Sequence, residues 1–326
     1  MIISKTPYRI SFFGGGSDYP SWYKHNGGAC LSTTIDKYVY LSLREIPNFF
    51  NHNYRISYSV VEEVKNIENI KHKAVKDILK YLNLKKNLEI HYDGDLPSKS
   101  GVGSSSCFVV GLLNCIYHFK NKKIKKHDLA KKSIFFEHDV MNEMVGVQDQ
   151  IASSYGGFNQ IKISKNGNFK IKKINLNPIN SNKLNDNLIL MFSNKQRIAD
   201  KIARTFVNKL NKSKYNYMDE ILSLVEPAKN SLLKNDFDEF GKLLDVSWKL
   251  KRSLSKSISN RYLDDIYEHA IKKGALGGKL LGAGGGGFFL FYVPKNKQKI
   301  FLNTFKKFTI VPFKFSDKGS EIIYSN

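Results

Sequence analysis

The order of apolar and polar residues predicts a strand-rich first half of the chain that contains one buried helix. Leu88, Ile90 and Tyr92 alternate with polar residues, a pattern that is typical of a strand. Between about 105 and 119 almost every position is apolar, so the helix predicted there is expected to be buried between layers. The other elements expected in this half are strands at 2–13 (interrupted by Pro7), 37–44 and 54–60, helices at 70–82 and 127–142, and a hairpin of 158–163 with 169–174.

The second half has mostly helical periodicity and ends in strands. It begins with a predicted strand at 188–192. The Asn-rich segment 175–187 just before it is predicted to be a linker between domains. We therefore expect an α+β protein with one domain at 1–180 and a second at 181–326. The remaining elements expected are helices at 198–211, 215–234, 236–256, 259–273 and 295–306, and strands at 288–293, 309–315 and 320–324.

Composition is typical of a globular protein that works in a reducing compartment. Of the 326 residues, 41% are hydrophobic and 25% are charged, which is enough apolar material for about two cores. No run of 18 apolar residues predicts a membrane-spanning helix, and the N-terminal residues lack the layout of a signal peptide. Cys30, Cys107 and Cys115 do not have the spacing of metal ligands, and we expect a cytoplasmic location.

The formal net charge of +23 allows two interpretations. One is a nucleic-acid binder. The other is a composition rich in Lys and Asn throughout, because the basic residues are spread along the whole chain and no recognition module or zinc spacing accompanies them. We expect no nucleic-acid partner and no membrane partner, although a basic surface would favour anionic metabolites.

A glycine- and serine-rich loop joins the strand at 88–92 to the buried helix. The first turn of a helix has unpaired N–H groups and a positive dipole end, so this arrangement is suited to phosphate. Gly101 and Gly103 would let the backbone approach an anion closely. A flexible surface loop is the alternative, and the loop is neither a Walker A motif nor a dinucleotide fingerprint. Its residues are Pro97, Ser98, Lys99, Ser100, Gly101, Val102, Gly103, Ser104, Ser105 and Ser106.

Two further loops are rich in glycine. The run Gly14-Gly15-Gly16-Ser17-Asp18 would bring backbone and a carboxylate close to a ligand, or it is only a tight turn with a capping aspartate. Five glycines in the six positions 282–287 would let two backbones, or a backbone and a ligand, come very close.

Two carboxylates and several cations are candidates for chemistry. Glu137 and Asp149 lie in otherwise apolar segments, where a carboxylate needs a partner or a metal ion; an exposed acid and a helix cap are the alternatives. Lys195 and Arg197 precede a predicted helix and would suit an anionic ligand, or they are solvated surface charges. Another basic cluster contains Lys249, Lys251 and Arg252.

Taken together, the motifs at 7–19, 97–106 and 279–287 resemble those of the GHMP kinases, the superfamily of galactokinase, homoserine kinase, mevalonate kinase and phosphomevalonate kinase. The resemblance covers nearly the whole chain. Within the superfamily the sequence is most similar to the family of D-glycero-D-manno-heptose 7-phosphate kinases, and fucokinases are similar in the same motifs. This finer similarity rests on residues 8–18, 36–39, 248–252 and 274–284.

The resemblance implies an N-terminal ATP-binding domain like domain 2 of ribosomal protein S5 and a ferredoxin-like C-terminal domain, with the active site between them. It implies a kinase that uses ATP and Mg²⁺ to phosphorylate the anomeric (C1) hydroxyl of the heptose 7-phosphate. The 1,7-bisphosphate would serve nucleotide-heptose and surface-polysaccharide synthesis. A fucokinase-like or other sugar 1-kinase is the alternative, and a catalytically silent binding protein is a third. The partner would be a small sugar phosphate, and the protein a monomer or homodimer.

The resemblance also implies roles for single residues. The loop 97–106 would embrace the phosphates of ATP, and Ser105 and Glu137 would ligate Mg²⁺. Asp149 would be the general base, and Arg9 would stabilise charge on the transferred phosphoryl group.

For the substrate, the resemblance and the charge pattern imply a separate set of residues. Asp18 would bind sugar hydroxyls, and Lys195, Arg197, Lys251 and Arg252 are candidates for the 7-phosphate. The loop 282–287 would support the phosphate loop and close one side of the pocket. The residues predicted for the substrate site are Gly15, Gly16, Ser17, Asp18, Lys195, Arg197, Arg252, Gly284 and Gly285.

Overall fold

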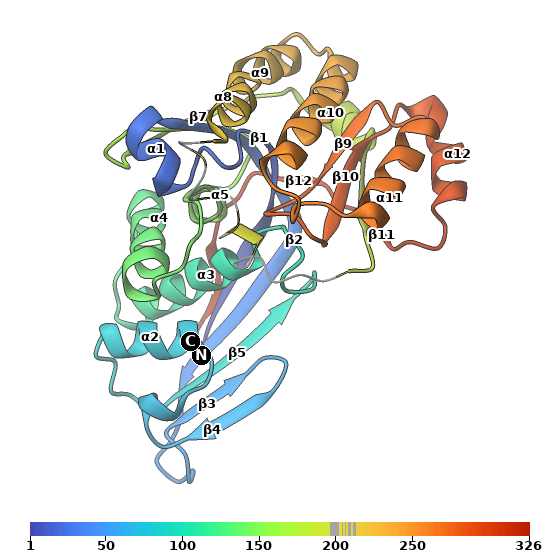
Figure 1. Ribbon diagram of the computed structural model, residues 1–326. Coiled ribbons are helices and arrows are strands. Elements are labelled where there is room, and N and C mark those ends of the chain that lie inside the picture. The colour runs from blue at the N-terminus through green and yellow to red at the C-terminus, as the bar shows by residue number, and fades with distance from the viewer. Residues whose placement is uncertain (196–201, 204, 206, 208–209, 211–212) are drawn as a thin grey trace.

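Two β-sheets with helices packed on them form the protein (Figure 1). The computed structural model describes residues 1–326 except 196–201, 204, 206, 208–209 and 211–212. The strands of the first sheet are β1 (Ile2–Phe13), β2 (Gly28–Glu45), β3 (Tyr54–Ser57), β4 (Val61–Val64), β5 (Leu88–Gly94), β6 (Asn159–Ile163), β7 (Phe169–Lys173), β12 (Phe315–Ser316) and β13 (Glu321–Ser325). Their order is β13-β1-β2-β5-β3-β4, with β12 and β6 also paired to β2, and β7 paired to β6.

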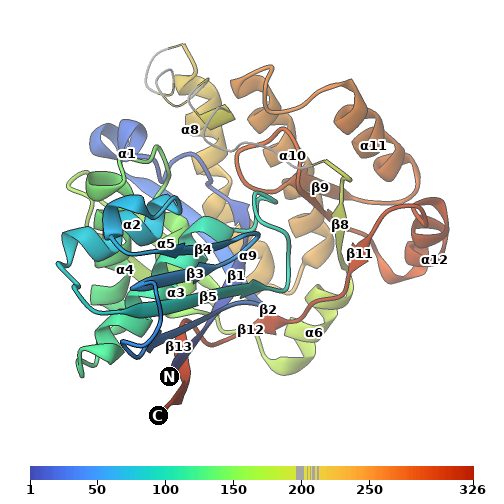
Figure 2. The same ribbon diagram turned by 90° about the horizontal axis from the view of Figure 1, so that it is seen from below.

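Helices from the first half of the chain cover one face of this sheet (Figure 2). The central helix α3 packs on β1 and β2, and it is buried along most of its length, as its apolar composition predicts. Cys107 and Cys115 are buried free thiols within it. The helical elements of this half are α1 (Pro20–Asn26), the 3₁₀ turn η1 (Ile67–Asn69), α2 (Lys73–Tyr81), α3 (Ser104–Phe119), α4 (Lys126–Phe135), the π-helical turn η2 (Phe136–Val140) and α5 (Gln148–Tyr155).

The second half builds a smaller antiparallel sheet in the order β11-β8-β10-β9. Trp248 and Phe289 are completely buried in a second core, which lies between this sheet and its helices. Within the described residues, no helix is both long and apolar enough to cross a membrane. The elements of this half are α6 (Pro178–Asp186), β8 (Leu188–Phe192), α8 (Tyr215–Ser223), α9 (Val225–Leu233), α10 (Phe237–Leu254), α11 (Arg261–Lys272), β9 (Gly277–Leu280), β10 (Phe288–Tyr292), α12 (Lys295–Thr304) and β11 (Ile310–Val311).

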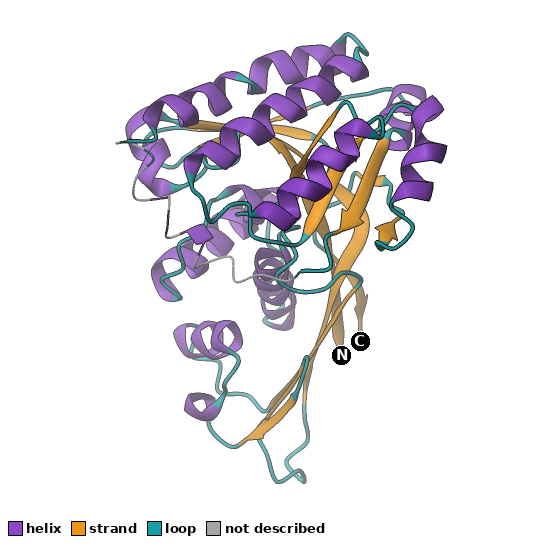
Figure 3. Cartoon of the chain, turned by 45° about the vertical axis from the view of Figure 1, so that its right-hand side comes forward, coloured by secondary structure: helices purple, strands orange, loops and turns teal. Residues whose placement is uncertain are grey.

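The chain returns to the first sheet at its end. β12 pairs with β2, and β13 pairs with β1, so that Ile2 lies opposite Ser325 and the two termini are neighbours (Figure 3). The last dozen residues therefore complete the sheet that the first strand began. The α+β class is confirmed, whereas a division at 180/181 remains a prediction.

Several elements differ from the sequence predictions. The expected linker 175–187 contains helix α6, because Asn177 caps it by accepting a hydrogen bond from the N–H of Asn180 at 2.8 Å, and Pro178 occupies the first turn. β1 runs through Pro7 without a break, with a register shift between Pro7 and Arg9 that accommodates the proline.

Other differences concern element ends and short elements. The helix expected at 127–142 is α-helical only as far as the end of α4, and the chain then continues as the π-helical turn η2. The short elements α1, β4 and β9 are absent from the sequence prediction, and β9 contains Gly277 and Gly278, which precede the third glycine-rich loop. Most of the helix predicted at 198–211, and Arg197, lie outside the described residues.

A buried carboxylate holds two arginines on the neighbouring strands of the first sheet. Glu89 on β5 is only 3% exposed and accepts hydrogen bonds from Arg44 Nε at 2.5 Å, Arg55 Nη1 at 2.8 Å and His91 Nε2 at 2.7 Å. Burial alone would raise the pKa of Glu89, but these hydrogen bonds outweigh burial and lower the pKa to about 2. The ionised carboxylate thus stabilises the β2–β5–β3 register.

We predict that Glu89→Gln lowers the free energy of unfolding by about 1–2 kcal/mol at pH 7, since the arginines are partly solvated. Because the folded-state pKa is depressed, this contribution is present above the unfolded value near 4.5 and is lost as the pH falls toward 2. Denaturant titrations of both proteins from pH 7 to pH 3 measure the difference, which should shrink below about pH 4.5. The matched control is Glu63→Gln: Glu63 also pairs with Arg55, at 3.2 Å, but is 51% exposed, and should change stability by less than about 0.5 kcal/mol. Equal effects of the two substitutions would contradict the assignment.

Candidate active site

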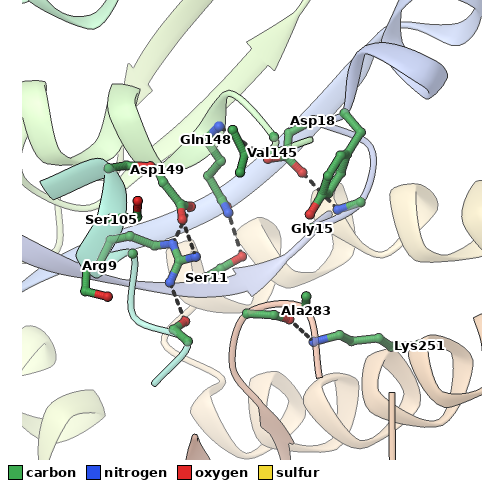
Figure 4. A pocket seen from close by; sticks show the side chains of 18 of the residues that line it. Arg9, Ser11, Gly15, Asp18, Ser105, Val145, Gln148, Asp149, Lys251 and Ala283 are labelled. Atoms are coloured by element: carbon green, nitrogen blue, oxygen red, sulfur yellow. Dashed lines mark hydrogen bonds and ion pairs between the residues drawn. The ribbon is translucent and has the colours of Figure 1, made fainter. Parts of the chain in front are cut away.

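A cavity of about 210 Å³ lies where the two halves of the chain meet, and all three glycine-rich motifs contribute to its wall (Figure 4). The first half supplies β1, the turn that follows it, the loop before α3 and the start of α5. The second half supplies the end of α10, β9 and the loop after β9. Segments far apart in the sequence therefore converge on one site.

An arginine–aspartate pair occupies the centre of this cavity. Arg9 Nε and Nη2 donate to the two carboxylate oxygens of Asp149 at 2.6 and 2.7 Å. The Arg9 side chain is almost fully buried, whereas that of Asp149 is 24% exposed. Burial alone would lower the pKa of Arg9, but the charge and hydrogen bonds of Asp149 outweigh burial and raise it. The predicted catalytic residues thus form one fixed bidentate unit.

The loop before α3 is fastened to this pair. Arg9 Nη1 donates to the carbonyl of Gly101 at 2.7 Å, and the Arg9 N–H donates to the carbonyl of Val102 at 3.1 Å. Gly103 has φ +82° at the N-cap of α3, and a Cβ there would lie 3.4 Å from Asp149 Oδ2. The unpaired N–H groups of the first turn of α3 therefore begin beside the arginine–aspartate pair.

The third glycine-rich loop supports the loop before α3. Phe288 donates its N–H to the carbonyl of Ser100 at 3.0 Å, and a Cβ on Gly287 would lie 2.2 Å from the same oxygen. Only glycine permits that approach. Gly282 and Ala283 line the cavity, whereas Gly284 packs on Ile258. Gly285 also packs away from the cavity, against Ile202. The supporting role of this loop was predicted, but the cavity-lining positions precede the predicted Gly284 and Gly285.

The turn after β1 places a buried carboxylate at the cavity wall. Asp18 is 4% exposed, and it accepts hydrogen bonds from the N–H groups of Gly16 at 2.9 Å and Gln148 at 3.3 Å. Burial, and then the charge of Asp149, raise the pKa of Asp18. Ser17 does not line the cavity; its Oγ stabilises the turn by donating to the Gly14 carbonyl at 2.7 Å. Of the predicted residues, Gly15, Gly16 and Asp18 line the cavity.

Glu137 on the π-helical turn is the candidate metal ligand. It is completely buried, it accepts a hydrogen bond from Ser106 Oγ at 3.0 Å and another from Gln150, and among the described residues its Oε1 has no partner. Burial, and then the charge of Glu143, raise the pKa of Glu137 to about 8. An orphaned, buried carboxylate oxygen fits a divalent cation, and Mg²⁺ takes few protein ligands when phosphates supply the others. No cluster of three or more acidic, His or Cys side chains suited to a metal exists in the described part of the chain.

The hydroxyl that touches Glu137 is one residue away from the predicted one. Ser106 is buried and binds the carboxylate, whereas Ser105 is exposed and lines the cavity at the first turn of α3. Among the described residues, the hydrogen bonds of Glu137 come from Ser106 and Gln150, and none comes from Ser105, its predicted partner in the metal site.

The cations predicted for a substrate phosphate are dispersed. Arg252 Nη1 pairs with Asp264 at 2.9 Å and lies over Trp248, and neither Arg252 nor Lys195 lines the cavity. Lys251 does line it, and its Nζ donates to the Leu280 carbonyl at 2.9 Å.

The sequence reasoning also missed polar residues of the wall. Ser11 donates to Gln148 Oε1 at 2.9 Å, which joins β1 to α5, and Lys279 lies in the wall from β9. The position of Gln148 beside Asp149, and of Lys279 at the head of the third motif, was the signal that could have identified them.

The Arg9–Asp149 pair lies beside the N-terminus of α3, and Glu137 has a buried carboxylate oxygen without a partner among the described residues. These features are those of a phosphoryl-transfer site. Comparison with known proteins agrees: residues 69–157 match the GHMP kinases N terminal domain, and residues 228–308 match the GHMP kinases C terminal. The chain belongs to the GHMP kinases.

Its similarity to individual relatives extends over nearly the full length. It is 29% identical to the D-glycero-alpha-D-manno-heptose 7-phosphate kinase of Campylobacter jejuni, covering 98% of this chain and 97% of that protein. It is 24% identical to the galactokinase of Pyrococcus furiosus, covering 91% and 90%. The solved D-glycero-D-manno-heptose 1-phosphate kinase of Bacteroides thetaiotaomicron has a TM-score of 0.79 at 22% identity, with all of both chains covered. The two-domain GHMP fold expected from the motifs is thus confirmed.

We predict that Gly146→Ala reduces phosphoryl transfer by about 100-fold, because the new Cβ would lie 1.8 Å from Asp18 Oδ2 and would displace the cavity wall. Gly146 has no positive φ, so the effect is steric. Initial-rate assays, with circular dichroism to verify folding, measure it. A folded variant with the activity of the wild-type protein would contradict the close packing of Gly146 on Asp18.

Proposed function

We propose that this sugar kinase transfers the γ-phosphoryl group of ATP to the anomeric (C1) hydroxyl of D-glycero-D-manno-heptose 7-phosphate. The product would be the 1,7-bisphosphate, a precursor for nucleotide-heptose and surface-polysaccharide synthesis. The observation that carries the proposal is the Arg9–Asp149 pair beside the N-terminus of α3. The similarity to the heptose 7-phosphate kinase over 98% of the chain supports the choice of substrate.

Asp149 is positioned to receive the proton of the sugar hydroxyl. Both of its oxygens bind Arg9, yet each carboxylate oxygen has a second lone pair, and the side chain is 24% exposed toward the cavity. An anomeric hydroxyl is more acidic than an ordinary alcohol, so a weakly basic carboxylate such as that of Asp149 suffices as the base. Arg9 also places a fixed positive charge where the transferred phosphoryl group would carry negative charge.

The start of α3 would hold the phosphates of ATP. Its free N–H groups, with those of Gly101 and Gly103, need no rearrangement to accept an anion, because Arg9 and Phe288 already fix the loop. Glu137, oriented by Ser106 and Gln150, would ligate Mg²⁺. When bound, Mg²⁺ would neutralise charge on the phosphate oxygens. The predicted direct ligand Ser105 lies at the cavity, one residue before the serine that orients Glu137.

A kinase of a free sugar is the second candidate. The position of Arg252 against Asp264, away from the cavity, favours it, because that arginine was expected to bind a substrate phosphate. Relatives include a bifunctional fucokinase of Arabidopsis thaliana, 24% identical over 90% of this chain but only 30% of that protein. The cytoplasmic location, the absence of a nucleic-acid partner and the monomeric or dimeric state remain predictions.

The substrate is tested by coupled ADP detection on a panel of D-glycero-D-manno-heptose 7-phosphate, the free heptose, L-fucose and D-galactose, with and without Mg²⁺. We expect Mg²⁺-dependent ADP release with the heptose 7-phosphate. Asp149→Asn should reduce turnover by about 10²- to 10⁴-fold, because the amide cannot accept the proton, while ATP still binds. Preference for a free sugar would refute the substrate, and near-normal turnover of Asp149→Asn would refute the base.

The adjacent serines provide a matched pair for the metal site. Ser106→Ala removes a hydrogen bond that orients Glu137, so the Mg²⁺ concentration for half-maximal activity should rise about 10-fold. Ser105→Ala leaves the contacts of Glu137 intact and should raise this Mg²⁺ concentration less than Ser106→Ala does. Magnesium titrations at saturating ATP measure both. A larger effect of Ser105→Ala would support Ser105 as the direct ligand.

A further inference from the structure

Lys279 is a buried cation at the junction of the two sheets. It lies on β9 and is 4% exposed, and its Nζ donates to the carbonyl of Phe12, at the end of β1, at 2.6 Å. It also lines the cavity that contains Arg9 and Asp149. The second half of the chain thus places an ammonium group against the strand that carries Arg9.

This ammonium group has more donors than the protein supplies acceptors. An ammonium group carries three N–H bonds. Among the described residues, the Phe12 carbonyl is the one hydrogen-bond acceptor of Lys279 Nζ, and a buried charge with unused donors is costly. Because Lys279 is part of the cavity wall, oxygens of a bound molecule can satisfy the remaining donors.

The acceptor sugar is the molecule that fits this position. Phe12 directly precedes the turn that brings Gly15, Gly16 and Asp18 to the cavity wall. The charge of Asp18 acts on Lys279, so a carboxylate and an ammonium group lie near one another with complementary roles toward hydroxyls. We infer that Lys279 donates hydrogen bonds to an oxygen of the bound sugar and determines specificity for it; this rests on the proposed function, in which the acceptor is a sugar.

A purely structural role is the alternative, since the bond from Lys279 to Phe12 also joins the two sheets. If the bond has only a structural role, replacing Lys279 would lower the stability of the protein but would leave its affinity for the sugar unchanged. A sugar-binding residue would raise the KM for the sugar and leave the KM for ATP unchanged. The two roles therefore differ in a measurable way.

The pH dependence gives a second test. Burial lowers the pKa of Lys279 to about 8, and the charge of Arg9 lowers it further whereas Asp18 and Cys30 raise it. Lysine is charged below its pKa, so kcat/KM for the sugar should fall above about pH 8. Arginine stays charged, so Lys279→Arg should lose this alkaline decline. The charges that act on Lys279 are those of Arg9 on β1, Asp18 in the following turn and Cys30 on β2. Of the charged residues of α10, Lys251 binds the carbonyl of the adjacent Leu280 and Asp245 lies close to Gly277, while β10 places Leu290 opposite Lys279.

The experiment compares the wild-type protein with Lys279→Met, Lys279→Arg and the control Lys229→Met. Lys229 has a mostly buried side chain but pairs with Glu226 and does not line the cavity. With D-glycero-D-manno-heptose 7-phosphate as the acceptor, Lys279→Met should raise the sugar KM about 10- to 100-fold and change the ATP KM less than about two-fold. Lys279→Arg should have a smaller effect, and Lys229→Met none on either KM.

An unchanged sugar KM in folded Lys279→Met would overturn the inference, whether or not its kcat is lower. If Lys279→Met does not fold, the wild-type pH profile and Lys279→Arg decide, and an alkaline decline that is absent, or identical in the two proteins, overturns it. If the wild-type protein accepts L-fucose or D-galactose but not the heptose 7-phosphate, the proposed substrate fails. The same comparison with the accepted sugar then tests Lys279 separately.

Discussion

The bidentate contact between Arg9 and Asp149 is the interaction on which the site depends. A buried guanidinium is tolerated only when its donors are satisfied, and here the carboxylate takes two and the Gly101 carbonyl takes a third. These three bonds fix β1, the loop before α3 and the start of α5 relative to one another. The pair thus builds the geometry of the site as well as providing its charges.

Close approaches of glycine backbone to neighbouring segments extend this arrangement across the cavity. Gly287 lets the β9–β10 loop touch the Ser100 carbonyl, and Gly146 lets the segment before α5 touch Asp18. A Cβ at either position would overlap its neighbour. Gly287 and Gly146 are therefore required by packing between segments, in addition to any approach to a ligand.

The main elements could be predicted because their signals are local. The apolar run of α3 and the alternation in β5 each identify an element without reference to the rest of the chain. Helix α6 could not be predicted from composition, because its Asn residues favour loops in general and one of them, Asn177, acts here as a cap. The order of Arg9, the glycine loops and Asp149 indicated the site because such combinations of motifs are rare.

Which neighbouring residue faces the site depends on helical phase. Successive helix residues point about 100° apart, so a motif that locates a helix does not say which neighbour faces inward. Ser106, and not Ser105, reaches Glu137; Lys251, and not Arg252, lines the cavity. Arg252 is instead held by Asp264 and by the faces of Trp248 and Tyr267. Which residues of a helix face the site depends on the tertiary neighbours of that helix, and these neighbours cannot be identified from a single sequence.

Charge is divided unevenly between the two halves of the cavity. The first half contributes the carboxylates Asp18 and Asp149 together with the cations Arg9 and Lys99, whereas the charged residues of the second half in the wall, Lys251 and Lys279, are both cations. Both lysines also bind backbone carbonyls. Lys251 binds that of Leu280 within the second half, whereas Lys279 binds that of Phe12 across the junction, so Lys279 provides both a charge in the wall and an attachment between the halves. The return of β12 and β13 to the first sheet fixes this arrangement through the chain itself. The site is therefore a property of the whole chain, since its wall comes from both halves and the second half alone would leave the buried Lys279 without the Phe12 carbonyl.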